Sequence, residues 1–305
     1  MHNPCFPRYF TAAFVGAVLM SQANLGQAAN TLSVEATADT FLTNDSRYAN
    51  SNMSSFGAMM ISAPVQNLAQ GISEFRTMEN LVAYNSAPIK AGFDSQYGIG
   101  NWHVTDVRLK WYSNFDIPGV PANNNQFNVP ATGFFNIYYF GNDQWFNPAT
   151  AGPSGLTNPD LTWNSVYAGG AYSGLFANQV LTGTFYYPGG TYNGTTDCAS
   201  VPDSCAPRFW DIDLTSDLLN DIAGGGYLSF HGAAADHQVV YLINQLTKPG
   251  AHPQIFVTAE AGAAPVPMPA AVWLLGSALA GLGIIARPGR QPAASGGSAD
   301  HGRNG

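Results

Sequence analysis

Apolar and polar residues alternate with a period of two over much of this chain, a pattern typical of half-buried antiparallel β-strands. In VTDVRLKWYS, residues 104–113, the apolar residues Val107, Leu109 and Trp111 are separated by charged residues. The pattern recurs in shorter segments, with Gly-, Pro- and Asn-rich stretches between them: 133–141, 208–215, 227–232, 238–244 and 253–260. Many short strands joined by such turns predict an all-β protein, an antiparallel β-sandwich of jelly-roll-like form.

One short helix is expected within this β region. In the segment before it, 208–215, we expect Trp210, Ile212 and Leu214 to point inward. The helix follows with Thr215 or Ser216 as N-cap and Gly224 as its end, and with an apolar stripe formed by Leu218, Leu219 and Ile222.

The first 29 residues have the pattern of a secretory signal peptide. Arg8 precedes the apolar run FTAAFVGAVLM, and small residues follow at 26–29. The apolar run is short for a membrane span. The alternative is a buried N-terminal helix, but a strand pattern follows directly. We therefore expect cleavage after residue 28 or 29, by signal peptidase, and export of the rest of the chain.

Near the other terminus, residues 270–286 contain no charged side chain. At about 1.5 Å per residue a helix over this segment is about 26 Å long, close to the lower limit for a bilayer core of ~30 Å. Trp273 lies near one end, and Arg287 follows the other, as the preferences of indole and positive charge predict. We expect a C-terminal transmembrane helix over 270–286 and a disordered tail over 291–305. A core helix of Ala, Gly and Leu is the alternative.

The segment VPMPAAVWLLGSALAGLGIIAR resembles the C-terminal sorting signals of the PEP-CTERM type, in their Val-Pro-Leu-Pro-Ala form. The match rests on a proline box, an apolar helix and a basic end, with these residues: Val266, Pro267, Pro269, Trp273, Gly276 and Arg287. Met268 departs from the usual Leu or Glu, and the chain continues beyond the usual stop. The resemblance implies a Gram-negative bacterium and an exosortase-like membrane protease that cuts within the sorting signal, 263–290, near Pro267–Pro269. It also implies an inner-membrane-tethered intermediate, followed by the cell surface or the extracellular matrix.

Residues 30–262 are expected to form one β-sandwich domain, because no linker-like change of composition interrupts them. The order of several short motifs in this region is similar to that of DNRLRE-like β-sandwiches, which resemble carbohydrate-binding modules. The motifs are an Ala-Asp-Thr strand at 38–40, Thr162–Trp163, Asp213–Leu214–Thr215 before the short helix, and a last strand at 252–260. The resemblance implies a β-sandwich of this type.

Charge and cysteine content narrow the choice of partners. The chain has 19 Asp and Glu against 11 Lys and Arg, a net charge of −8. Nucleic acids and anionic membrane surfaces are therefore poor partners. Cys198 and Cys205 flank a turn-rich loop and should form a disulfide outside the cell. The alternatives are a metal pair or a redox pair, but the spacing is not Cys-x-x-Cys.

No catalytic motif frames the histidines, and we expect His103, His231, His237 and His252 to be loop residues at strand ends. Asp211 and Asp213 share one strand face and could form a glycosidase pair. A cap for Asp213 and a solvated position for Asp211 are the simpler interpretation. Extracellular sandwiches also bind structural Ca²⁺ through carboxylates. The candidates here are Asp39, Asp45, Asp211 and Asp213.

Aromatic residues beside turn signals suggest a surface on which sugar rings stack. Trp145, Tyr186 and Tyr187 are the candidates for exposed glycan-binding residues. The sequence thus predicts an exported, non-enzymatic component of the cell surface or of an exopolysaccharide matrix, as in a biofilm, with glycan binding as its activity. A secreted carbohydrate-active hydrolase or lyase, and a purely structural matrix protein, are the two alternatives.

Overall fold

The computed structural model describes residues 28–64, 76–113, 132–149, 157–188, 207–247 and 252–262, all within a compact unit that ends at Gly262. The elements of the described residues are the strands β1 (Asn30–Thr43), β2 (Ala58–Ser62), β3 (Met78–Asn85), β4 (Trp102–Tyr112), β5 (Gly133–Phe140), β6 (Val180–Tyr187), β7 (Pro207–Asp211), β8 (Tyr227–Ala234), β9 (Val240–Asn244) and β10 (Gln254–Ala261), and the helices α1 (Ala87–Tyr97), α2 (Trp163–Tyr167) and α4 (Ser216–Gly224).

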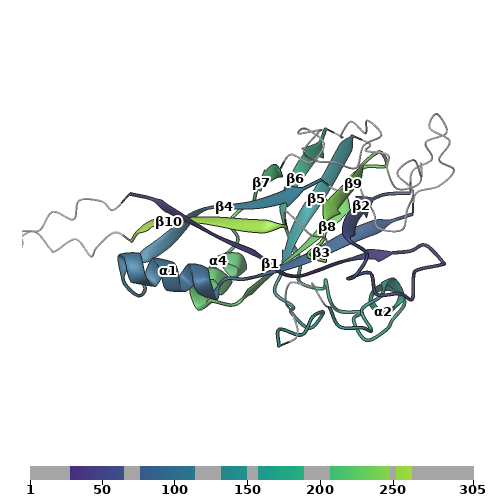
Figure 1. Ribbon diagram of the computed structural model, residues 1–305, viewed down its shortest axis with the longest axis horizontal. Coiled ribbons are helices and arrows are strands. Elements are labelled where there is room, and N and C mark those ends of the chain that lie inside the picture. Colours follow the sequence, from purple (N-terminus) through teal and green to yellow (C-terminus); the bar gives the residue numbers. More distant parts are fainter. Residues whose placement is uncertain are drawn as a thin grey trace, which may run out of the picture. The chain divides into compact units, whose positions relative to one another are not determined.

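The strands pair antiparallel throughout, in the order β6-β5-β8-β3-β1-β10-β4-β7, and β2 joins β3 to β9. Strand β1 belongs to both halves of this order: its first half pairs with β10 and its second half with β3, with a register shift between Ala36 and Ala38. Beyond β7, the amide of Asp213 donates to the carbonyl of Thr182 in β6. The two ends of the strand order therefore meet, with β7 beside β6 (Figure 1). Side chains from strands throughout this order share one core. The all-β prediction is confirmed, in a β-sandwich-like form.

The main core lies inside the curled sheet and is rich in aromatic side chains. Val107, Leu109 and Trp111 of β4 are fully buried there, as their alternation predicts. The stack of Tyr187 on Tyr241, with ring centroids 4.2 Å apart, closes part of the same core. Leu214 does not follow the predicted alternation, since it is 38% exposed. The strand ends at Asp211, so the alternation does not extend to Leu214.

A second, smaller core lies on the other face of β1, β3 and β5. Ala38, Leu81 and Phe140 contribute to it from the strands. The described parts of the segment from residue 141 to 178, which includes α2, cover this face with Trp145, Phe146, Leu161, Val166 and Leu175. The second half of β1 is consequently buried on both faces, whereas its first half alternates.

The helices number three among the described residues, so the expectation of a single helix is wrong. Helix α4 has the predicted N-cap, since Thr215 accepts a hydrogen bond from the amide of Leu218. Helix α1 packs against α4 and against β1, β4 and β10, and it buries Ile89 and Phe93. Helix α2 is a single turn with a capping box between Thr162 and Ser165.

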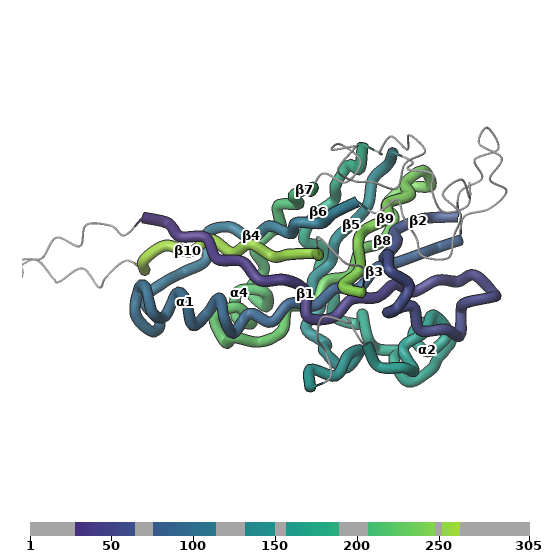
Figure 2. The backbone as a smooth tube through the Cα atoms, in the orientation of Figure 1, coloured from purple at the N-terminus to yellow at the C-terminus, as the bar shows by residue number. Residues whose placement is uncertain are grey.

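The first residues of β1 and the last residues of β10 lie side by side, because Asn30 pairs with Ala259 (Figure 2). The predicted signal peptide, apart from Ala28 and Ala29, and the predicted sorting signal with its helix at 270–286 are outside the described residues. Within the described part of the chain, no helix has the length and apolar character needed to span a membrane.

Candidate functional site

Helix α4 presents a polar face to solvent beside one end of the sheet. Leu218 and Ile222, four residues apart, are fully buried in the main core. The opposite face carries Asp217, Asn220 and Asp221, which follow the i, i+3, i+4 spacing of neighbours on a helix. Two carboxylates at this spacing repel each other by a few tenths of a kcal/mol (roughly 0.2–0.5). A helix that keeps such a pair on one face is a candidate for a binding role.

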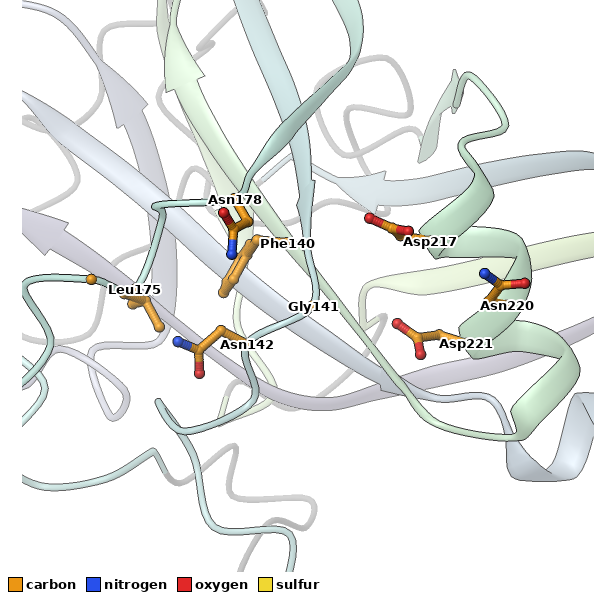
Figure 3. Close-up of a pocket in the computed structure, with 9 residues that line it drawn as sticks. Phe140, Gly141, Asn142, Leu175, Asn178, Asp217, Asn220 and Asp221 are labelled. Atoms are coloured by element: carbon orange, nitrogen blue, oxygen red, sulfur yellow. The ribbon is translucent and has the colours of Figure 1, made fainter.

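This polar face forms one wall of a pocket of about 410 Å³. The second wall comes from the end of β5, with Phe140, Gly141 and Asn142, and from a turn before β6, with Gly174, Leu175 and Asn178. Figure 3 shows the carboxylates of Asp217 and Asp221 pointing from α4 toward the end of β5. The volume falls within the range of small-molecule sites, roughly 300–1,000 Å³.

Buried polar groups behind the pocket hold its acidic wall. The hydroxyl of Tyr139, on the inner face of β5, donates to Oδ2 of Asp221. Burial, together with this contact, raises the pKa of Tyr139, so the phenol stays protonated and remains a donor. The orientation of the Asp221 carboxylate is therefore set by the core of the sheet and not by solvent alone.

A second hydrogen-bond chain fixes the loop that follows β5. Nε1 of Trp145 donates to Oγ of Ser229 at 3.0 Å, and Ser229 donates to Oδ1 of Asp143 at 2.7 Å. Burial raises the pKa of Asp143; the hydrogen bond from Ser229 opposes this rise, and the negative charge of Asp221 adds to it. Asp143 adjoins Asn142, so this chain of hydrogen bonds also positions the side-chain amide of Asn142 at the pocket wall.

The chemistry of the pocket suits a ligand with many hydroxyl groups. Its three amide side chains both donate and accept hydrogen bonds, and its two carboxylates accept them. Phe140 and Leu175 add apolar surface, while Gly141 brings backbone close to Asp221, since a Cβ there would lie 3.8 Å from Oδ2. Among the described residues there is no group of three or more His, Cys, Asp or Glu able to hold a metal ion.

The exposure predicted for the three aromatic candidates is right for one of them. Tyr186 is 51% exposed and lies 5.1 Å from the ring of Phe134 on the outer face of β5 and β6. Trp145 is fully buried, because the loop after β5 folds back over the sheet. Tyr187 has the opposite strand parity to Tyr186 and points into the main core. Neither Trp145 nor Tyr187 can stack on a sugar in this conformation.

The four calcium candidates lie at separate places: Asp39 within β1, Asp45 just after β1, Asp211 at the end of β7 and Asp213 just after β7. Asp39 is buried in β1, where its Oδ2 accepts a 2.8 Å hydrogen bond from the amide of Leu246. Asp45 pairs with Arg47 at 2.7 Å, and this contact lowers the pKa of Asp45. Asp211 and Asp213 are exposed at the end of β7. Their positions do not assemble one site from all four.

His231 corrects the expectation that the histidines are loop residues at strand ends. It lies inside β8 and is only 3% exposed. Its strand partner in β5 is Tyr138, and its partner in β3 is Leu81. The other three histidines lie at a strand end or in a loop, as predicted: His103, His237 and His252.

Several predicted residues are outside the described part of the chain. They are Cys198 and Cys205, and the sorting-signal residues Val266, Pro267, Met268, Pro269, Trp273, Gly276 and Arg287. The pocket itself was not predicted from the sequence. The spacing of Asp217, Asn220 and Asp221 along the predicted helix is the one signal in the sequence that points to this pocket.

Comparison with known proteins adds no relative to this description. The chain matches no protein-family model, and a search of curated proteins finds no significant match either.

Proposed function

We propose that this protein is an exported, non-enzymatic component of the bacterial cell surface or extracellular matrix, and that it binds a glycan in the pocket between α4 and the end of β5. Export is supported by the leader-like pattern of residues 1–29 and by the resemblance of residues 266–287 to a sorting signal. Glycan binding is supported by one observation above all: carboxylates, amides and apolar side chains converge on one open pocket.

The charge of the site favours a neutral glycan. Asp217 and Asp221 accept hydrogen bonds from sugar hydroxyls, and charge-assisted hydrogen bonds of this kind are the stronger ones. None of the lining residues is cationic, and the whole chain has a net charge of −8. A polyanionic chain therefore meets like charge at the pocket, which disfavours its binding.

Affinity electrophoresis of the full-length protein tests glycan binding. We expect retardation in gels that contain a neutral glucan, mannan or galactan, and little retardation with a polyuronate. Asp217→Asn and Asn178→Ala should each weaken the retarding interaction, by roughly tenfold for the carboxylate. Asp160→Asn, a substitution in an exposed turn, is the matched control. If the pocket variants bind as tightly as the control, the glycan does not use this pocket.

A carbohydrate-active hydrolase is the second candidate, and one observation favours it. Asp143 has a raised pKa and lies near the carboxylate of Asp221, and glycosidases combine a proton-bearing acid with a second carboxylate. Release of reducing ends from the same polysaccharides separates the two functions. Turnover that is lost in Asp143→Asn supports the enzyme, whereas retardation without turnover supports the binding protein.

Export and processing are tested on the protein recovered from its native host. Intact-mass analysis should show that the first 28 or 29 residues are absent and that the chain ends near Pro267–Pro269. A full-length mass in the cytosolic fraction contradicts the proposed export.

A further inference from the structure

His231 is a buried histidine between two aromatic rings. Its ring lies parallel to that of Phe176, with centroids 4.1 Å apart and an interplanar angle of 8°. Tyr138 of β5 stacks at a centroid distance of 5.6 Å and an angle of 26°. One of these rings belongs to the sheet and the other to the turn before β6, so the imidazole joins the two.

Both ring nitrogens of His231 are also engaged. Nδ1 lies 2.8 Å from Oε1 of Gln179, and Nε2 lies 3.2 Å from Oε2 of Glu79 in β3. The same Glu79 oxygen accepts a hydrogen bond from the hydroxyl of Tyr167 in α2. His231 thus contacts the turn at two residues, Phe176 and Gln179, from a fixed position in the sheet.

The two contacted residues directly follow residues that line the pocket. Leu175 precedes Phe176, and Asn178 precedes Gln179. The segment 174–179, which we call the pocket turn, is held by its own backbone bonds: the amide of Ala177 donates to Gly174 and that of Gln179 to Phe176, both at 3.2 Å. A shift of the contacted residues must therefore move the pocket residues with them.

We propose that His231 is a positioning residue for the pocket, which holds the pocket turn in the geometry that binds the ligand. This inference rests on the proposed glycan binding, and His231 itself does not line the pocket. A wall that is fixed before binding lowers the ordering cost of association, which is the general benefit of preorganisation. Without His231, the pocket turn loses a ring contact and a hydrogen bond to the sheet, so Asn178 is held less firmly.

A double-mutant cycle on the full-length protein tests this role. His231→Phe keeps an aromatic ring beside Phe176 but removes both hydrogen bonds, and we expect glycan affinity to fall about five- to tenfold. In the Asn178→Ala background the same change should cost less than twofold, because the contact that His231 positions is already absent. In the Asp217→Asn background the full five- to tenfold loss should remain. Equal losses in all three backgrounds would overturn the proposal.

Hydrogen exchange gives a measurement that needs no ligand. The amides of Ala177 and Gln179 should exchange at least fivefold faster in His231→Phe, while amides of β3 keep their wild-type rates. Unchanged exchange in the pocket turn contradicts the proposal, even if no glycan is bound and the proposed function fails. Gln179→Leu removes one contact from the turn side without altering the sheet, and it should give the same local effect if His231→Phe does not fold.

Discussion

Two neighbouring glycines end helix α4, and we expect opposite effects when each is replaced by alanine. Gly225 has φ 75° and ψ 31°, the left-handed conformation of a helix C-cap, and its amide donates to the carbonyls of Asp221 and Ile222. Gly224 is the last helical residue, and a Cβ built there has no atom within 4 Å. The helix ends at Gly224, as the sequence predicts, and the left-handed residue is the next one, Gly225.

The expected magnitudes follow from these two conformations. An L-residue in the left-handed region costs about 1–2 kcal/mol. At position 225 the new Cβ would also lie 3.1 Å from Cδ of Lys90 and 3.4 Å from Cα of Ala87, and only the lysine can move easily. Gly224→Ala meets no atoms and stabilises the helix by roughly 0.5–1 kcal/mol, because it reduces the freedom of the unfolded chain.

Thermal and urea unfolding of the two variants provide the assay. For a domain of this size each kcal/mol shifts Tm by roughly 2–4 °C. Gly225→Ala should therefore lower Tm by about 2–8 °C, and Gly224→Ala should raise it by about 1–4 °C. Two shifts of the same sign, or a larger loss for Gly224→Ala, would show that α4 does not end as the structure has it.

Three further predictions concern the buried groups. Burial raises the pKa of Asp39 well above its ordinary value. The stabilising contribution of protonated Asp39 is therefore complete below about pH 4 and declines as pH rises through the folded-state pKa. The free energy of unfolding of wild type should fall relative to Asp39→Asn over that range, and parallel pH profiles contradict this. Trp145→Phe removes the donor to Ser229 and should lower the free energy of unfolding by about 1–3 kcal/mol in urea; no change means that this hydrogen-bond chain is unimportant. Phe93→Ala should lower the free energy of unfolding by about 3–5 kcal/mol, since Phe93 fills the space between α1 and the sheet. A decrease below about 1 kcal/mol would show that α1 is not part of the core.

The features that could be predicted from the sequence depend on local pattern. The alternation over 104–113 corresponds to β4, and the cap residue Thr215 marks the start of α4. Helix α1 has only two buried residues, Ile89 and Phe93, so its apolar stripe is too short to stand out beside strand patterns. The Pro near its N-terminus and Gly98 after its end are start and stop signals typical of a helix.

The candidate site depends on contacts between distant segments, and these are not visible in the sequence. Asp217 and Asn178 line the same pocket only because the end of β5 brings α4 and the pocket turn together. Trp145 follows a strand and precedes a proline, which suggests an exposed loop. In the structure its side chain is buried in the second core instead. For Tyr186 and Tyr187 the alternation allows either residue to be inside, and only the pairing of β6 with β5 decides between them.

The most direct test of the account is a backbone NMR or crystallographic experiment with an oligosaccharide of the neutral glycan that retards the protein most. We predict that the sugar contacts Asp217 and Asp221 of α4 and Asn178 of the pocket turn, and that shift changes or density are confined to that end of the sheet. A sugar bound instead on the outer faces of the sheet, around Tyr186 or Phe209, with the pocket unaltered, would contradict the account.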